Sequence, residues 1–325
     1  MKPLTARTPS THPLTHPLLI ALLALLCCAL WGSASPAIKI GYELLEIRGV
    51  PSTLLFAGVR FAAAGVLTVL IYSLAGRRLL YPKRQNLPRV LTVSAFQTVI
   101  QYVFFYIGLA NTTSVKGTVA SGSSAFFCVL VASLIFRQEK LTFKKILACL
   151  LGFTGILLVN VQGLTFTLSF LGDGFVILST VSYAVSSVLM KRFSAYEDPV
   201  VISGYQFIIG GSLMAVLGAC LGGTMRLTDG RGVLLLVYLA LLSAVAYAVW
   251  GLLLKYNPVS RVSVFSFTTP VFGTLLSMLL LPGQSGVDPW MLALTLLLVC
   301  AGILLLNYTP RPKRGKGTSA PPDAA

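Results

Sequence analysis

Long apolar runs separated by short polar segments make up most of this chain. A helix needs about 20 apolar residues to cross the hydrocarbon core of a bilayer, and the sequence holds ten runs of that length. They predict membrane-spanning helices at 18–40, 52–74, 90–109, 117–136, 143–161, 173–191, 200–223, 233–254, 260–280 and 289–307. Because the connections are too short for a soluble domain, the pattern predicts an all-α integral membrane protein with ten transmembrane helices.

The second half of this pattern repeats the first at an offset close to 145 residues. Three aligned pairs show it: VRFAAAG (59–65) with YQFIIGG (205–211), VKGTVASGSSAFFCVL (115–130) with SRVSVFSFTTPVFGTL (260–275), and GILLVN (155–160) with GILLLN (302–307). The first pair places Arg60 opposite Gln206. Each repeat, 18–161 and 173–307, holds five predicted helices. Since five is odd, the second repeat enters the membrane from the opposite side, which predicts inverted repeats around a shared midplane site. A duplicated scaffold that carries nothing is the alternative.

Composition supports a membrane environment. Hydrophobic residues make up 56% and charged residues 10% of the chain, whereas soluble domains are about one quarter charged. The six cysteines lie in apolar runs without the spacing of a metal or disulfide site, so we expect small core residues. The first run is too long for a cleaved signal peptide.

The net charge of +16 would suggest nucleic acid in a soluble chain, but here the basic residues flank apolar runs. If both termini are cytoplasmic, 19 lysines and arginines face the cytoplasm and five face the other side, as the positive-inside rule expects. We therefore predict a multi-pass protein of the cytoplasmic membrane, with no nucleic-acid partner. Residues 1–17 and the basic segment 308–325 are predicted to be disordered tails, and the second is suited to contact anionic lipid.

Several short motifs resemble the EamA-type transporters of the drug/metabolite transporter (DMT) superfamily. They are the Trp-Gly pair at Trp31, Pro51 with Arg60 and Phe61, GLANTTSVKGTVASGSSAFF followed by Glu139, GFTGILLVN, and Tyr247 with Pro270. The resemblance runs from about residue 20 to 307. It implies a ten-helix importer or exporter of small organic solutes, often amino acids or related metabolites.

The sequence departs from the family pattern in two places. Ser124 or Ala125 stands where a proline usually lies near the middle of the fourth helix, so the residue that would break that helix is missing. Gln284 stands where an acidic residue is expected opposite Glu139.

Arg60 is the most informative single residue. It lies about eight residues, or roughly 12 Å, from the outer end of its helix, and no Asp or Glu lies well inside a predicted span. Charges inside a membrane are costly and usually functional. Two roles fit: Arg60 binds a substrate carboxylate, or it donates to backbone carbonyls of a neighbouring helix. The lack of membrane-embedded carboxylates and histidines also favours facilitated transport or exchange over proton coupling.

Other polar and aromatic residues recur at helical spacing, as a cavity-lining face requires. With Arg60, the predicted substrate-binding residues are Trp31, Gln97, Gln101, Tyr183, Gln206, Tyr247 and Trp250. The predicted residues of a translocation hinge or cavity wall are Ser35, Pro36, Ser121, Ser124, Ser266, Thr269 and Pro270. Small hydroxyls also mediate plain helix packing, and prolines also kink helices for packing alone, so each residue keeps a structural alternative.

Together these features favour a transporter of small polar metabolites such as amino acids, working by alternating access. The spans hold no HExxH motif, aspartate pair or Ser–His pair, which argues against an intramembrane enzyme and predicts neither metal nor cofactor. Two alternatives stay open: a receptor or assembly subunit that transports nothing, and an exporter of drug-like or lipid solutes. The predicted partners are a small solute and membrane lipids, and the sequence defines no oligomeric state.

Overall fold

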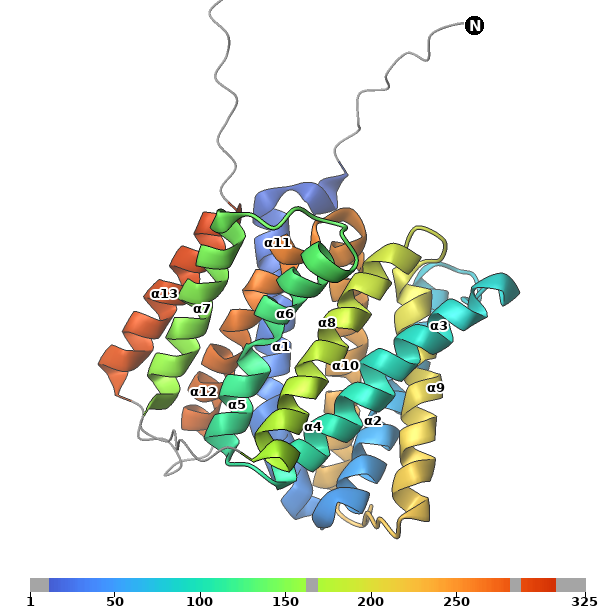
Figure 1. Ribbon diagram of the computed structural model, residues 1–325. Coiled ribbons are helices and arrows are strands. Elements are labelled where there is room, and N and C mark those ends of the chain that lie inside the picture. The colour runs from blue at the N-terminus through green and yellow to red at the C-terminus, as the bar shows by residue number, and fades with distance from the viewer. Residues whose placement is uncertain (1–11, 162–168, 281–287, 308–325) are drawn as a thin grey trace, which may run out of the picture.

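The computed structural model describes residues 12–161, 169–280 and 288–307, and these form one bundle of helices (Figure 1). Nine segments within the described residues are long and apolar enough to cross a membrane. The predicted span 143–161 corresponds to α7 (Phe143–Asn160), which packs along α13 (Pro289–Asn307). The predicted all-α membrane fold is therefore confirmed, with helix limits close to the predicted ones.

The helices follow the predicted order in both repeats. The first repeat contains α1 (Pro17–Leu44), α2 (Gly49–Ala75), α3 (Leu87–Ser94), the π-helical η3 (Ala95–Ile100), α4 (Gln101–Ala110), α5 (Ser114–Gly122), α6 (Ser124–Leu130), the π-helical η4 (Val131–Ile135) and α7. The second contains the π-helical η6 (Phe170–Gly174), α8 (Phe175–Phe193), α9 (Pro199–Cys220), α10 (Gly230–Tyr256), α11 (Val259–Ser263), the 3-10 helix η7 (Val264–Phe267), α12 (Thr268–Leu280) and α13.

The first and last described residues meet at the same end of the bundle. Asn257 Nδ2 donates to the Leu14 carbonyl (2.9 Å), and Arg261 Nε, four residues further along, donates to Asn307 Oδ1 (3.0 Å). His12 also stacks on Tyr256 with ring centroids 3.8 Å apart. The predicted disordered tail up to residue 17 is therefore too long, because residues 12–16 pack against the bundle. Residues 1–11 and the predicted tail 308–325 lie outside the described residues.

A seam of glycines joins the two repeats where α2 crosses α9. A Cβ atom at Gly58 would lie 2.2 Å from the backbone nitrogen of Ala215, and one at Gly211 would lie 2.3 Å from that of Ala62. The residue numbers rise along α2 as they fall along α9, so these equivalent helices run antiparallel, as inverted repeats require. The glycine seam comprises Gly58, Gly65, Gly204, Gly211 and Gly218.

The fourth helix is interrupted in spite of its missing proline. Its two pieces, α5 and α6, meet at Ser123, whose backbone N–H bonds to the Ala120 carbonyl (3.1 Å) and whose hydroxyl donates to the same oxygen. The matching helix of the second repeat is divided into α11, η7 and α12, with Pro270 in the first turn of α12. A hydroxyl that bonds to the preceding turn thus accompanies the break in one repeat, and a ring without N–H in the other.

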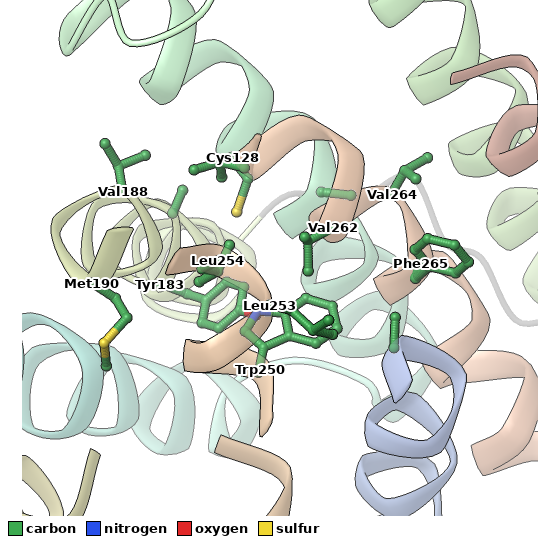
Figure 2. Packing of buried hydrophobic residues seen from close by; sticks show 14 of the residues in the cluster. Cys128, Tyr183, Val188, Met190, Trp250, Leu253, Leu254, Val262, Val264 and Phe265 are labelled. Carbon is green, nitrogen blue, oxygen red and sulfur yellow. The ribbon is translucent and has the colours of Figure 1, made fainter. Parts of the chain in front are cut away.

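The largest buried apolar cluster also draws on both repeats. Figure 2 shows Cys128 of α6, Tyr183 of α8 and Trp250 of α10 within it, close to Phe265 of η7. Cys27, Cys28, Cys128 and Cys149 are buried, which confirms these four as core residues, whereas Cys220 and Cys300 are exposed.

Candidate solute-binding site

A π-helical turn positions the two glutamines of the third span. Gln97 lies within η3 and Gln101 begins α4, and the hydroxyl of Ser182 on α8 donates to the Phe96 carbonyl inside the π turn (2.6 Å). The wider turn places residues four apart on nearly the same face. π-Helical turns occur frequently at functional sites, and this one turns Gln97, which is 2% exposed, into the bundle.

An aromatic layer crosses the interface between the repeats. Phe61 stacks on Phe207 with centroids 5.0 Å apart and planes at 10°, while Tyr102 lies 4.4 Å from Phe61 and Tyr247 lies 4.7 Å from Phe207. The hydroxyls of Tyr102 and Tyr247 share a 2.8 Å hydrogen bond. We use the name aromatic layer for Trp31, Phe61, Tyr102, Phe207, Tyr247 and Trp250.

Trp31 joins this layer from α1. Its ring makes edge contacts with Tyr247 (5.2 Å) and Trp250 (4.9 Å), so the structure brings three predicted residues into direct contact. Tyr183, a fourth, is 8% exposed and lies with Trp250 in the buried cluster shown in Figure 2. A single layer therefore contains residues from α1, α2, α4, α9 and α10, with α8 beside it.

Arg60 sits at the edge of the aromatic layer. It is 4% exposed, its Cζ lies 4.2 Å from the centre of the Phe61 ring, and its guanidinium faces the Tyr102 hydroxyl. Among the described residues, the structure gives Arg60 no carboxylate and no backbone carbonyl as a partner, and its Nε makes no hydrogen bond. The recorded contact of the Arg60 cation is therefore the face of the Phe61 ring.

Gln206, which stands opposite Arg60 in the repeat, has a different environment. It is fully buried, and its Oε1 accepts the hydroxyl of Thr98 in η3. Its backbone carbonyl accepts the Ser94 hydroxyl (2.9 Å). Gln206 therefore fastens α9 to the third span, yet its Nε2 has no hydrogen-bond partner.

Unpartnered buried polar atoms gather around these residues. Such atoms are rare in folded proteins, and each costs about 1–3 kcal/mol when nothing satisfies it. Seven of those in the described chain belong to residues that the sequence analysis selected: Trp31 Nε1, Arg60 Nε, Gln97 Oε1, Gln101 Oε1, Gln206 Nε2, Trp250 Nε1 and Thr269 Oγ1. Trp31 and Trp250 belong to the aromatic layer, and Arg60, Gln101 and Gln206 each directly precede one of its members in the sequence.

The predicted hinge residues are more scattered. Ser121 and Ser124 flank the break at Ser123 and are partly buried. The Ser266 hydroxyl donates to the Ser263 carbonyl (2.7 Å), within its own helical turn. α1 continues through the buried Pro36 without a break, and Ser35 beside it is exposed.

Sequence reasoning missed several aromatic residues of the site. Tyr102 directly follows Gln101, and Tyr106, which is 5% exposed, lies one helical turn further on the same face. Phe61 and Phe207 directly follow the aligned pair Arg60 and Gln206. The same helical spacing that selected the glutamines would have found the tyrosines.

A separate pocket of about 390 Å³ lies at the end of the bundle where the first and last described residues meet. Glu139 lies in its wall: the carboxylate pairs with Lys145 (2.8 Å) and accepts both the backbone N–H and the hydroxyl of Ser260. Burial alone would raise the pKa of Glu139, but the bonds from Lys145 and Ser260 outweigh it and lower that pKa below its usual value. Glu139 thus fastens the loop before α7 to the start of α11, across the two repeats.

The comparison with known families agrees with this architecture. The profile of the EamA-like transporter family matches residues 18–161 and 170–308, one match for each repeat. The chain belongs to this family. The matched ranges follow the two five-helix repeats that the sequence predicted.

Two of three relatives of this EamA-like protein carry transporter names, and the third is named as WAT1-related. An uncharacterized transporter of Archaeoglobus fulgidus is 27% identical over 77% of this chain and 86% of its own length. An uncharacterized transporter of Synechocystis is 28% identical over 87% and 88%. A WAT1-related chloroplastic protein of Arabidopsis thaliana is 26% identical over 77% of this chain and 61% of its own length. One crystal structure of a protein shares the fold at a TM-score of 0.73 and 19% identity, covering 88% of this chain and 95% of the other.

Proposed function

We propose that this EamA-like transporter carries small polar organic metabolites, such as amino acids, by alternating access. The proposal rests chiefly on one observation: Arg60 is buried without a carboxylate partner, within a layer of unpartnered polar atoms between the two repeats. Burying an uncompensated cation and several unpaired dipoles is unfavourable in the empty protein. A complementary solute would relieve this cost, and that relief favours its binding.

The unpartnered atoms favour a particular solute chemistry. Arg60 Nε, Trp31 Nε1 and Trp250 Nε1 are donors and suit the oxygens of an anionic group such as a carboxylate. Gln97 Oε1 and Gln101 Oε1 are acceptors, which suit an ammonium or hydroxyl group of the same molecule. The aromatic layer favours an apolar or ring-bearing side chain between them.

The repeat architecture supports alternating access. The glycine seam provides a close contact between the halves, and each repeat contains one interrupted span, α5–α6 in the first and α11–α12 in the second. In this proposal the bundle end that holds Leu14 and Asn307 is cytoplasmic, as the distribution of basic residues favours, and the protein resides in the cytoplasmic membrane. The Glu139 contacts would then close the cytoplasmic side.

Transport in vesicles tests the proposal. The purified protein would be reconstituted, and the uptake of labelled amino acids, organic acids and cationic drugs compared with that of Arg60→Gln. We expect uptake of carboxylate-bearing solutes, weakened at least tenfold in affinity by Arg60→Gln, since a charged hydrogen bond contributes about 1.5–3 kcal/mol. Arg48→Gln is the matched control, because this arginine is exposed at the start of the same helix.

A thermal-shift screen on the same proteins separates the alternatives. A solute present at about 100 times its dissociation constant adds roughly 2.7 kcal/mol to the folded state. Stabilisation without vesicle flux would indicate a receptor or assembly subunit. A response to apolar or cationic drugs that survives Arg60→Gln would overturn the proposal in favour of a drug or lipid exporter.

A further inference from the structure

The end pocket at Glu139 shares no lining residue with the candidate solute-binding site. It is built from both repeats, and its wall consists of Glu139, Lys140, Thr142, Lys145, Pro258, Ser260, Arg261 and Leu306. Three of these residues are cationic and one is anionic. The pocket therefore has an excess of two positive charges.

The carboxylate neutralises one cation and leaves two. Glu139 pairs with Lys145, and both side chains are largely buried, at 8% and 15% exposure. Arg261 is partly buried, and its Nε donates to the amide oxygen of Asn307. Within the described residues the structure gives Arg261 and Lys140 no carboxylate partner. A partly buried guanidinium beside a cavity is well suited to two parallel hydrogen bonds with a phosphate.

The surroundings of the pocket favour a lipid as the source of that phosphate. α7 and α13 lie side by side at the edge of the bundle (Figure 1). Phe143, next to Thr142 of the pocket wall, is 78% exposed, and Leu304, two residues before Leu306, is 68% exposed. Large apolar side chains are thus exposed on both α7 and α13 near this end of the bundle, as a surface in contact with acyl chains requires. Basic pockets between helices at a membrane face suit anionic headgroups.

We propose that this pocket binds a phosphate-bearing anion, supplied by the headgroup of an anionic phospholipid. Arg261 and Lys140 hold the phosphate oxygens, the Thr142 hydroxyl borders them, and the acyl chains lie along α7 and α13. The occupant touches the loop before α7 in the first repeat and α11 in the second, so it reinforces the junction that Glu139 already makes.

Lipid titration of the full-length protein in neutral detergent tests this site. Phosphatidylglycerol would be added and the thermal unfolding midpoint recorded, with phosphatidylcholine of the same acyl chains as the zwitterionic reference. Native mass spectrometry would count the retained lipids. We expect phosphatidylglycerol to raise the midpoint, phosphatidylcholine to leave it unchanged, and Arg261→Gln to weaken the apparent affinity about tenfold, as the loss of a charged hydrogen bond predicts.

Two further variants make the outcome decisive. Arg78→Gln is the matched control, because Arg78 is exposed in the loop after α2 and lies outside the pocket; its lipid response should equal that of the wild type. Lys140→Gln replaces an exposed side chain and decides the matter if Arg261→Gln fails to fold. An undiminished phosphatidylglycerol response in Arg261→Gln, or in Lys140→Gln where the first variant does not fold, would overturn the site.

Titration with soluble phosphates distinguishes a phospholipid headgroup from a soluble phosphate as the occupant of the pocket. Inorganic phosphate and glycerol 3-phosphate would be titrated against the same proteins. A weak response to both, against a strong response to phosphatidylglycerol, supports the lipid. An equal, Arg261-dependent response to glycerol 3-phosphate would keep the phosphate site but overturn the lipid as its occupant.

Discussion

Phe61 of the first repeat and Phe207 of the second occupy equivalent positions and stack on each other at 5.0 Å. Tyr102 and Tyr247, 145 residues apart, likewise meet across the interface through their hydroxyls. Immediately before the phenylalanines the likeness ends, because Arg60 stands in one repeat and Gln206 in the other. Gln206 is engaged by Thr98 and fully buried, whereas Arg60 faces tyrosines with its Nε unpartnered.

The residues that match between the repeats and those that differ therefore have different roles. The matched aromatic pairs and the glycine seam contribute equivalent contacts from both repeats, which the proposed alternating access would use. At the mismatched positions only the first repeat places a positive charge beside the aromatic layer. A solute with one anionic group would therefore bind in one direction.

The largest loss of stability is expected from a substitution in the glycine seam. Gly58→Ala would place a Cβ atom 2.2 Å from a backbone nitrogen of α9, so the two helices must separate. We expect the free energy of unfolding to fall by about 3 kcal/mol, measured by thermal or denaturant unfolding in detergent. Gly230→Ala at the start of α10, where a Cβ meets nothing within 4 Å, should be nearly neutral. Equal behaviour of the two variants would contradict the close contact.

Moving the positive charge from the first repeat to the second tests whether the position of Arg60 determines solute affinity. In the double variant Arg60→Gln with Gln206→Arg, the cation lies against η3 instead of Tyr102, and the Thr98 hydrogen bond is lost. We expect solute affinity to stay at least tenfold below that of the wild type, measured by vesicle uptake. Recovery of uptake would show that the net charge of the layer, rather than the position of Arg60, determines binding.

Glu139 also differs between the repeats, because the aligned residue of the second repeat is Gln284, which lies outside the described residues. Glu139→Gln removes this difference. Because the pKa of Glu139 is lowered in the folded protein, its contribution to stability is present above its ordinary pKa of about 4.3. That contribution is lost as the pH falls through the lowered value. We expect Glu139→Gln to reduce stability by about 2 kcal/mol at pH 7.

The pH dependence checks this assignment. Unfolding of wild type and Glu139→Gln would be compared between pH 7 and pH 3.5, and the gap between the two proteins should narrow as the carboxylate is protonated. A gap that stays constant over this range would mean that the ionised form of Glu139 is not what stabilises the junction.

The smallest expected effect concerns the matched tyrosines. Tyr102→Phe and Tyr247→Phe each remove one partner of the 2.8 Å hydroxyl pair and keep the rings, so each should cost about 1 kcal/mol of stability. The double variant should cost less than the sum of the two, because both act on one bond. Strict additivity in this double-mutant cycle would show that the two hydroxyls do not stabilise each other.

Much of the fold followed from the sequence because apolar run length and the repeat are strong signals. The helix limits and the correspondence of α2 with α9 needed only the bilayer thickness and the alignment, whereas the packing of these two helices through the glycine seam was not predicted. The break at Ser123 did not follow, because it depends on a serine hydroxyl and on packing, such as that of Gly122 against Ile156, and not on a proline. The π turn at η3 was also hidden, since its stabilising contact comes from Ser182, far along the chain.

The sequence selected the polar residues of the candidate site and the aromatic residues Trp31, Tyr247 and Trp250, but it did not select Phe61, Tyr102 and Phe207. Polar residues such as Gln97 stand out in an apolar span, whereas Tyr102 and Phe207 look like ordinary membrane residues until their contacts are known. The environments of Arg60 and Gln206 could not be separated by alignment, because Thr98 and Tyr102, which distinguish them, come from another helix.

The glycine seam also bears on how the chain arose. Gly65 aligns with Gly211, and Gly58 aligns with Gly204. Each repeat therefore contributes glycines at equivalent positions to the contact between α2 and α9. A patch that fits its own copy is the hallmark of a two-fold dimer. This symmetry is consistent with a single five-helix ancestor that paired antiparallel with its own copy through this surface before the gene was doubled. After such a fusion Arg60 and Gln206 could diverge. The seam glycines could not, because the close contact between α2 and α9 leaves no room for a Cβ atom.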